Sequence, residues 1–164
     1  MTGWLRRAGH GSAPDGAVVT WSVAEGRRGR RWREVVATGE GIRSSLLLEL
    51  DPDGRFSHLE LSTAAGLLTL HPEGDGTLHG NRVTIGGVHH LRSPWDPSTT
   101  VVVEGSTVCV AAAPRGGAVR GWLRIRRDLG LEPTSDPIDT AAVDADGLPV
   151  LDGGGTWPLE LEES

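Results

Sequence analysis

Several features of membrane and secreted proteins are missing from this 164-residue chain. No apolar run approaches the ~18 residues of a transmembrane helix, and residues 1–16 contain no apolar stretch of the kind that a signal peptide has. The single cysteine, Cys109, cannot form an intramolecular disulfide, and its valine-rich surroundings predict a buried thiol. These absences favour a reducing compartment without a membrane span, and we expect a cytoplasmic protein.

Lysine is also absent, so all 16 basic residues are arginine, against 22 Asp and Glu residues. The net charge of −6 argues against a nucleic-acid-binding protein, because phosphate contacts need a basic surface. Walker, dinucleotide-binding, nucleophile-elbow and Ser-x-x-Lys motifs do not occur. The sequence therefore predicts no catalytic residue and no cofactor, and it leaves enzyme activity open.

What the chain does contain is alternating Val and Leu, interrupted by 24 Gly and 10 Pro residues, a pattern typical of short strands separated by turns. Residues 1–16 lack this alternation, which indicates a flexible leader before a single β domain over 17–164. Helix is expected at most as one turn near 127–131. The predicted strands cover 17–24, 31–37, 42–50, 55–63, 66–71, 77–85, one bent strand or two within 99–112, 119–126, 138–144 and 156–161.

About ten short antiparallel strands are more than one open sheet usually holds without curling. The sequence therefore predicts an all-β, single-domain protein with very little helix, built as a curled antiparallel sheet in the form of a β-roll or partly open barrel.

Two β-hairpins can be recognised most clearly, because their turn sequences are distinctive. Asp51-Pro52-Asp53-Gly54 places Pro and Gly where a tight turn needs them. With a bulge at Gly54, Leu50 would face Phe56 and Leu48 would face His58, whereas a four-residue loop would shift this register by one. The second hairpin turns at 72–76 and brings His71 near Thr77 or Leu78.

Tryptophan stands out among few aromatic residues, since there are six Trp, one Phe and no Tyr. A buried indole fills a core, and an exposed one offers a flat apolar surface to a ligand. For a ligand groove the candidates are Trp21, Trp32, Trp95 and Trp122, of which Trp32 and Trp95 are expected to be partly exposed. Phe56, at the first hairpin, joins them.

A basic run surrounds Trp32, from Arg27 to Arg33. The guanidinium fork suits an anionic head group, although the same arginines could pair with this protein's own carboxylates. Arg31 and Arg33 are therefore candidate ligand-binding residues, together with His58 and Glu60 across the first hairpin.

Five of the six histidines fall between residues 58 and 90. Imidazoles from neighbouring strands can hold a divalent metal, and the two hairpins could gather His58, His71 and His79. The alternative interpretation treats them as polar residues of turns and strands. A metal-binding β-barrel, with or without enzyme activity, is thus the second hypothesis.

Three segments resemble a bacterial glycolipid-binding family. They are the strand from Trp21 to Glu25, the hairpin IRSSLLLELDPDGRFSHLEL followed by LLTLHPEGDGTLHG, and the late VDADGLPVL. The family's Pro-Phe-Thr-Asn run has no counterpart here, where HHLRSPWDPSTTVVVEGS stands instead. The resemblance implies a curled β-roll that encloses an apolar groove for a glycolipid.

The leading expectation is therefore a non-enzymatic protein that binds an amphipathic or lipid-like small molecule in an apolar groove. A protein-interaction module is a third hypothesis. The oligomeric state is left open.

Overall fold

The computed structural model describes residues 4–113, 121–135 and 143–158. Within these ranges the chain forms a nine-stranded sheet, a three-stranded sheet and one short helix. The elements are β1 (Arg6–Ser12), β2 (Val18–Gly26), β3 (Gly29–Thr38), β4 (Gly41–Leu50), β5 (Phe56–Thr63), β6 (Gly66–Pro72), β7 (Thr77–Thr84), β8 (Gly87–Pro94), β9 (Thr99–Val103), α1 (Thr107–Ala112), β10 (Gly121–Ile125), β11 (Leu131–Thr134) and β12 (Asp152–Pro158).

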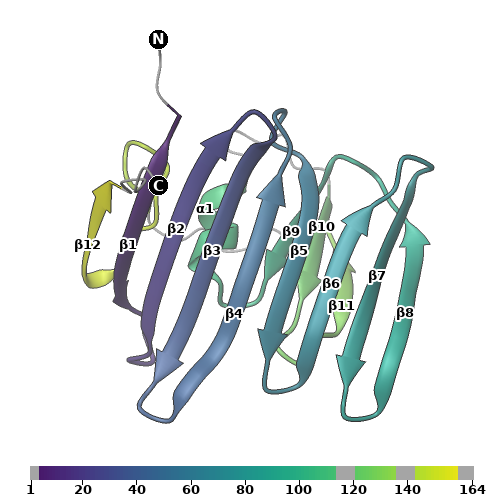
Figure 1. Ribbon diagram of the computed structural model, residues 1–164, viewed down its shortest axis with the longest axis horizontal. Coiled ribbons are helices and arrows are strands. Elements are labelled where there is room, and N and C mark those ends of the chain that lie inside the picture. The colour runs from purple at the N-terminus through teal and green to yellow at the C-terminus, as the bar shows by residue number, and fades with distance from the viewer. Residues whose placement is uncertain (1–3, 114–120, 136–142, 159–164) are drawn as a thin grey trace, which may run out of the picture.

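The large sheet is an antiparallel meander in which β1 to β8 follow one another in space as in sequence, with β12 returning to pair with β1 (Figure 1). The six strands predicted between residues 17 and 85 correspond to β2 through β7, and those predictions are confirmed. Alternation of apolar and polar residues with short turns is sufficient to specify this part of the fold.

The small sheet and α1 lie on one face of the large sheet, behind it in Figure 1, and the core fills the space between them. β10 pairs in parallel with β9 and antiparallel with β11. Alternate residues of the long strands face this core, while the opposite sheet face is covered by no element of the described ranges. The core-facing residues include Trp21, Val23, Trp32, Val36, Leu46, Leu48, Leu59, Leu61, Leu68 and Leu70.

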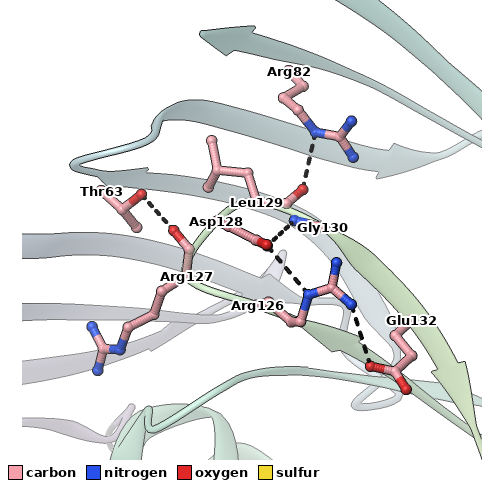
Figure 2. A network of polar contacts seen from close by, with 8 residues as sticks. All are labelled: Thr63, Arg82, Arg126, Arg127, Asp128, Leu129, Gly130 and Glu132. Carbon is pink, nitrogen blue, oxygen red and sulfur yellow. Dashed lines mark hydrogen bonds and ion pairs between the residues drawn. The ribbon is translucent and has the colours of Figure 1, made fainter.

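The turn between β10 and β11 connects the small sheet to the large one through two hydrogen bonds and a buried side chain (Figure 2). The hydroxyl of Thr63 on β5 donates to the carbonyl of Arg127 at 2.9 Å, and Nε of Arg82 on β7 donates to the carbonyl of Leu129 at 3.0 Å. Leu129 has φ of 69° and a fully buried side chain. Packing against the large sheet therefore offsets the cost of a left-handed backbone at a residue that has a Cβ.

Neither sheet is closed or strongly curled, so the expected β-roll or partly open barrel is not formed. The edges of the large sheet, β12 and β8, lie at opposite ends in Figure 1. The prediction assumed that all strands share one sheet. The chain instead divides them between two sheets and covers one face of the larger with the smaller, which buries apolar surface without closure.

The leader predicted for residues 1–16 was wrong over Arg6–Ser12, which form β1 between β2 and β12. This strand shows no apolar alternation because small residues occupy its core side. A Cβ on Gly9 would meet the indole of Trp21, and one on Gly11 would meet Leu151. The space beside Gly9 is filled by Trp21 of β2, and the space beside Gly11 is filled by Leu151, which precedes β12.

The segment 99–112 was also misread, since only Thr99–Val103 is a strand and the helix α1 follows. Its β-branched residues favour a strand. The helix forms because Ser106 caps it, accepting from the amide of Cys109 at 3.1 Å, and because Glu34 on β3 meets its first turn. The helical turn expected at 127–131 is the hairpin turn of Figure 2.

Most of the strand predicted at 138–144 and the end of that at 156–161 lie outside the described residues; β12 includes the first part of the latter. In the part of the chain that is described, no helix has the length and apolar character that crossing a bilayer requires.

Candidate functional site

A cavity of about 350 Å³, which we call the apolar cavity, lies between the end of the large sheet, α1 and the start of β9. Its walls come from three separate regions of sequence, namely the β4–β5 hairpin, residues 97–101 and residues 109–113. Apolar side chains provide only about half of its surface, and the polar groups come from Asp53, Arg55, Ser98, Thr99 and Thr100. The apolar lining includes Leu48, Leu50, Phe56, Val101, Cys109 and Ala112.

The β4–β5 turn shapes this cavity. One carboxylate oxygen of Asp51 accepts from the amides of Asp53 and Arg55, both at 2.9 Å, and Gly54 takes the left-handed position with φ of 81°. The strands then pair with a bulge after Glu49, so Leu50 lies opposite Phe56. Of the two registers that the sequence left open, the one with a bulge at Gly54 included the Leu50–Phe56 pair, which forms. Its Leu48–His58 pair does not form, because Glu49 lies opposite His58.

Helix α1 forms the far wall and is held from β3. The buried carboxylate of Glu34 accepts from the hydroxyl of Thr107 at 2.9 Å and from the amide of Val108 at 3.0 Å. Burial raises the pKa of the Cys109 thiol to about 12, so this side chain lines the cavity as a small apolar group and not as a nucleophile.

A second cavity of about 590 Å³, with more charged side chains, adjoins the first at the upper edge of the large sheet in Figure 1, where the β2–β3 and β4–β5 turns lie side by side. The two cavities have Leu50, Asp53, Gly54 and Ala112 in common. Trp4, which is 53% exposed, stands at the rim. The charged groups of the second cavity are Glu25, Arg27, Arg30, Asp51 and Asp53.

Of the aromatic candidates, Phe56 lines the apolar cavity. Trp21 and Trp32 are core residues that contact each other, with ring centroids 6.3 Å apart. The expected partial exposure of Trp32 was wrong, since it is 1% exposed: it occupies the core phase of β3, while Arg31 and Arg33 point to the other face.

Trp95 and Trp122 are half-buried. Trp95 contacts the edge of Phe56 with centroids 5.6 Å apart and lines a separate shallow cavity with Leu78 and Leu123. The partial exposure expected for Trp95 is confirmed. The structure thus brings Trp95 next to Phe56. It does not bring Trp21, Trp32 or Trp122 to Phe56.

The polar candidates lie on the uncovered face. Arg31 pairs with Glu49 at 2.9 Å, and Arg33 is exposed. Nε2 of His58 lies 3.4 Å from the Glu60 carboxylate on the same strand. This face carries the side chains that alternate with the core residues, so His58 and Glu60 point away from the apolar cavity.

The histidines of the metal hypothesis also lie on this face. His71 is directly opposite His79, with ring centroids 6.2 Å apart, but His71 contacts Glu73 at 2.9 Å and His79 contacts the hydroxyl of Thr77 at 2.8 Å. Throughout the described ranges, no three His, Cys, Asp or Glu side chains converge to hold a metal ion. The expected grouping of His58, His71 and His79 into a metal site is therefore not formed.

Sequence reasoning missed α1's part of the cavity, because the helix itself was not predicted. It also missed Leu48 and Leu50, which alternation assigns to the core without indicating that they border an empty space. The Asp-Pro-Asp-Gly turn was the available signal, since it places Phe56 at the strand end where the cavity opens.

No protein-family model matches this sequence, and neither a curated protein nor a solved structure matches it.

Proposed function

We propose that this protein binds an amphipathic small molecule without transforming it, with the apolar part in the cavity that Leu48, Leu50 and Phe56 line. The observation that carries the proposal is the junction, through four shared residues, of two cavities that differ in charge: two charged side chains line the first and five line the second. A volume of about 350 Å³ lies within the range of about 300–1,000 Å³ usual for small-molecule sites.

The energetics favour a ligand with an alkyl part. Each methylene that leaves water for such a cavity contributes about 0.8 kcal/mol, so ten methylenes contribute about 8 kcal/mol, and an association cost of about 4 kcal/mol leaves roughly millimolar affinity from the chain alone. A wholly apolar guest that extended into the neighbouring cavity would displace water from its charged groups without pairing them, so a guest with a polar end is favoured there. The glycolipid class implied by the family resemblance has this two-part character and stays a prediction.

Native mass spectrometry of the purified protein, with titration of a dansylated undecanoic acid, tests this function. We expect a co-purified adduct or saturable fluorescence. Ala112→Leu, which introduces bulk where the two cavities meet, should weaken probe binding at least tenfold. Ala64→Leu, in the exposed β5–β6 turn, is the matched control and should bind normally. Absence of both adduct and probe binding would show the proposal to be wrong.

A second candidate function is protein interaction through β8. This edge strand is exposed along nearly its whole length. Beside it, on the uncovered face, Leu67 lies opposite Val83 and Val83 opposite Val88, at 42%, 39% and 58% exposure. Such an edge with an adjacent apolar patch can add a strand from a second copy of the chain.

Light scattering across a concentration series tests this second function. We expect a dimer that Val83→Glu returns to monomer, because the substitution places a charge in the patch. A protein that stays monomeric at every concentration would exclude self-pairing through β8.

A further inference from the structure

Arginine is concentrated around a third cavity, of about 350 Å³, at the β2–β3 turn. In a protein of net charge −6, this cavity has more basic than acidic groups. Its carboxylates are Glu25 and Glu49. Its arginines are Arg6, Arg27, Arg28, Arg30 and Arg31.

Ion pairs within the protein neutralise two of these five arginines. Arg30 pairs with Glu25 at 2.8 Å and Arg31 with Glu49 at 2.9 Å, which uses both glutamates. Within the described part of the chain, Arg6, Arg27 and Arg28 pair with no carboxylate. Three guanidinium groups around one cavity therefore have no carboxylate partner among residues 4–113, 121–135 and 143–158.

The backbone of the turn does not require these arginines. Arg27 and Arg28 form a two-residue tip between Gly26 and Gly29, which are paired. Gly29 takes the left-handed position with φ of 111°, and a Cβ there would meet the Leu50 carbonyl. Positions 27 and 28 have ordinary φ values, so turn geometry would accept other residues. Two adjacent like charges also repel each other.

The basic cavity extends to the uncovered face, where Arg31 and Glu49 lie, and it meets the charged cavity at the β2–β3 turn. Arg27, Gly29, Arg30 and Leu50 line both it and the charged cavity, which in turn adjoins the apolar cavity. A ligand with its chain beside Phe56 would thus direct its polar end toward the arginine turn.

We propose, on the premise of the proposed function, that the polar end of the ligand is an anion, a phosphate or carboxylate, bound by Arg27 with Arg28 and Arg6. The guanidinium fork donates two parallel hydrogen bonds to either group, and charge-assisted bonds of this kind are about twice as strong as neutral ones. The anion would also supply a counter-charge to the three arginines that pair with no carboxylate of the described residues.

Calorimetric titration with decyl phosphate, decanoate and decyl glucoside, each below its critical micelle concentration, separates the two proposals. The two decyl ligands carry the same ten-carbon chain, and decanoate has nine alkyl carbons beyond its carboxyl carbon. We expect at least one anion to bind tenfold or more tightly than the glucoside at 50 mM salt, with the difference shrinking at 500 mM salt. Inorganic phosphate alone should bind more weakly than decyl phosphate, because the chain contributes.

The variant Arg27→Gln/Arg28→Gln should lose the preference for anions while its affinity for decyl glucoside stays within twofold. Arg92→Gln/Arg124→Gln, which removes the same charge away from the cavity, should keep the preference. If no ligand binds, the proposed function is wrong. If all three bind equally, or if the remote variant loses the preference as well, the anion site is wrong although binding of amphiphiles stands.

Discussion

At the level of single residues, Glu34 links the two layers of the molecule. Its carboxylate is 4% exposed on the core side of β3 and accepts hydrogen bonds from the first turn of α1. A carboxylate is costly to bury unless its oxygens are satisfied, and the amides at a helix start are otherwise unpaired. The Glu34 carboxylate and the amide of Val108 therefore satisfy each other's need for a hydrogen-bond partner.

Replacement of Glu34 by alanine should lower the free energy of unfolding by about 1–3 kcal/mol, because the buried amide of Val108 loses its acceptor. Glu34→Gln keeps an acceptor oxygen and should cost less. Urea unfolding followed by tryptophan fluorescence measures both. Glu40→Ala, at an exposed turn, is the control, and an equal loss in Glu34→Ala and Glu40→Ala would contradict the role assigned to Glu34.

Trp32 and Glu34, two core residues of β3, show which features alternation along a strand can predict and which it cannot. The phase of β3 places Trp32 with Glu34, on the face opposite Arg31 and Arg33, and this follows from sequence alone. That the Glu34 face is the buried one does not, because its partners Thr107 and Val108 are more than 70 residues away in the chain.

At the level of elements, the β10–β11 turn positions the small sheet. It presents carbonyl oxygens to Thr63 and Arg82 and inserts Leu129 among the core residues. Asp128 stabilises the turn itself by accepting from the amide of Gly130 at 2.9 Å. The sequence predicted a helical turn here, whereas the structure has a hairpin turn. The difference arises because the docking that holds Leu129 in a left-handed conformation involves residues distant in sequence.

Leu129→Ala should destabilise the protein by about 2–5 kcal/mol, because a fully buried leucine leaves a cavity that the rigid layers cannot fill. The matched control is Leu67→Ala on the uncovered face, where the leucine is 42% exposed, and its loss should be well under half as large. Chemical unfolding gives both values. Similar losses would mean that the turn does not hold the sheets together.

At the level of the whole molecule, acid should lower the stability of the folded state below about pH 4. The pKa values of Asp15, Asp75 and Asp128 lie below their ordinary 3.8, chiefly through hydrogen bonds from Arg43, the Thr77 hydroxyl and the Gly130 amide respectively. A carboxyl with a lower pKa in the folded state stabilises it above 3.8, and this contribution disappears as pH falls through the lowered value.

Thermal unfolding between pH 2.5 and 6 should show this as a falling Tm below pH 4. Asp128→Asn, which cannot titrate, should start from a lower Tm and fall less steeply. Parallel curves for the two proteins would exclude Asp128 as a contributor.

The candidate site was only partly predictable at this scale. The hairpin at residues 51–54 and the arginine turn are local patterns, so Phe56 and the basic run could be found from sequence. The cavity walls contributed by Val101, Cys109 and Ala112 depend on how α1 and the small sheet dock, which no local pattern encodes.

The buried thiol in the cavity wall gives a kinetic measure of how often the layers separate. With its pKa near 12 and 1% exposure, Cys109 can be alkylated only while α1 is transiently away from β3 and β9. Its rate of labelling by iodoacetamide therefore reports the opening equilibrium, relative to the rate in the unfolded chain. A guest bound against that wall would slow labelling in proportion to its occupancy, and unchanged rates at saturation would place the guest elsewhere.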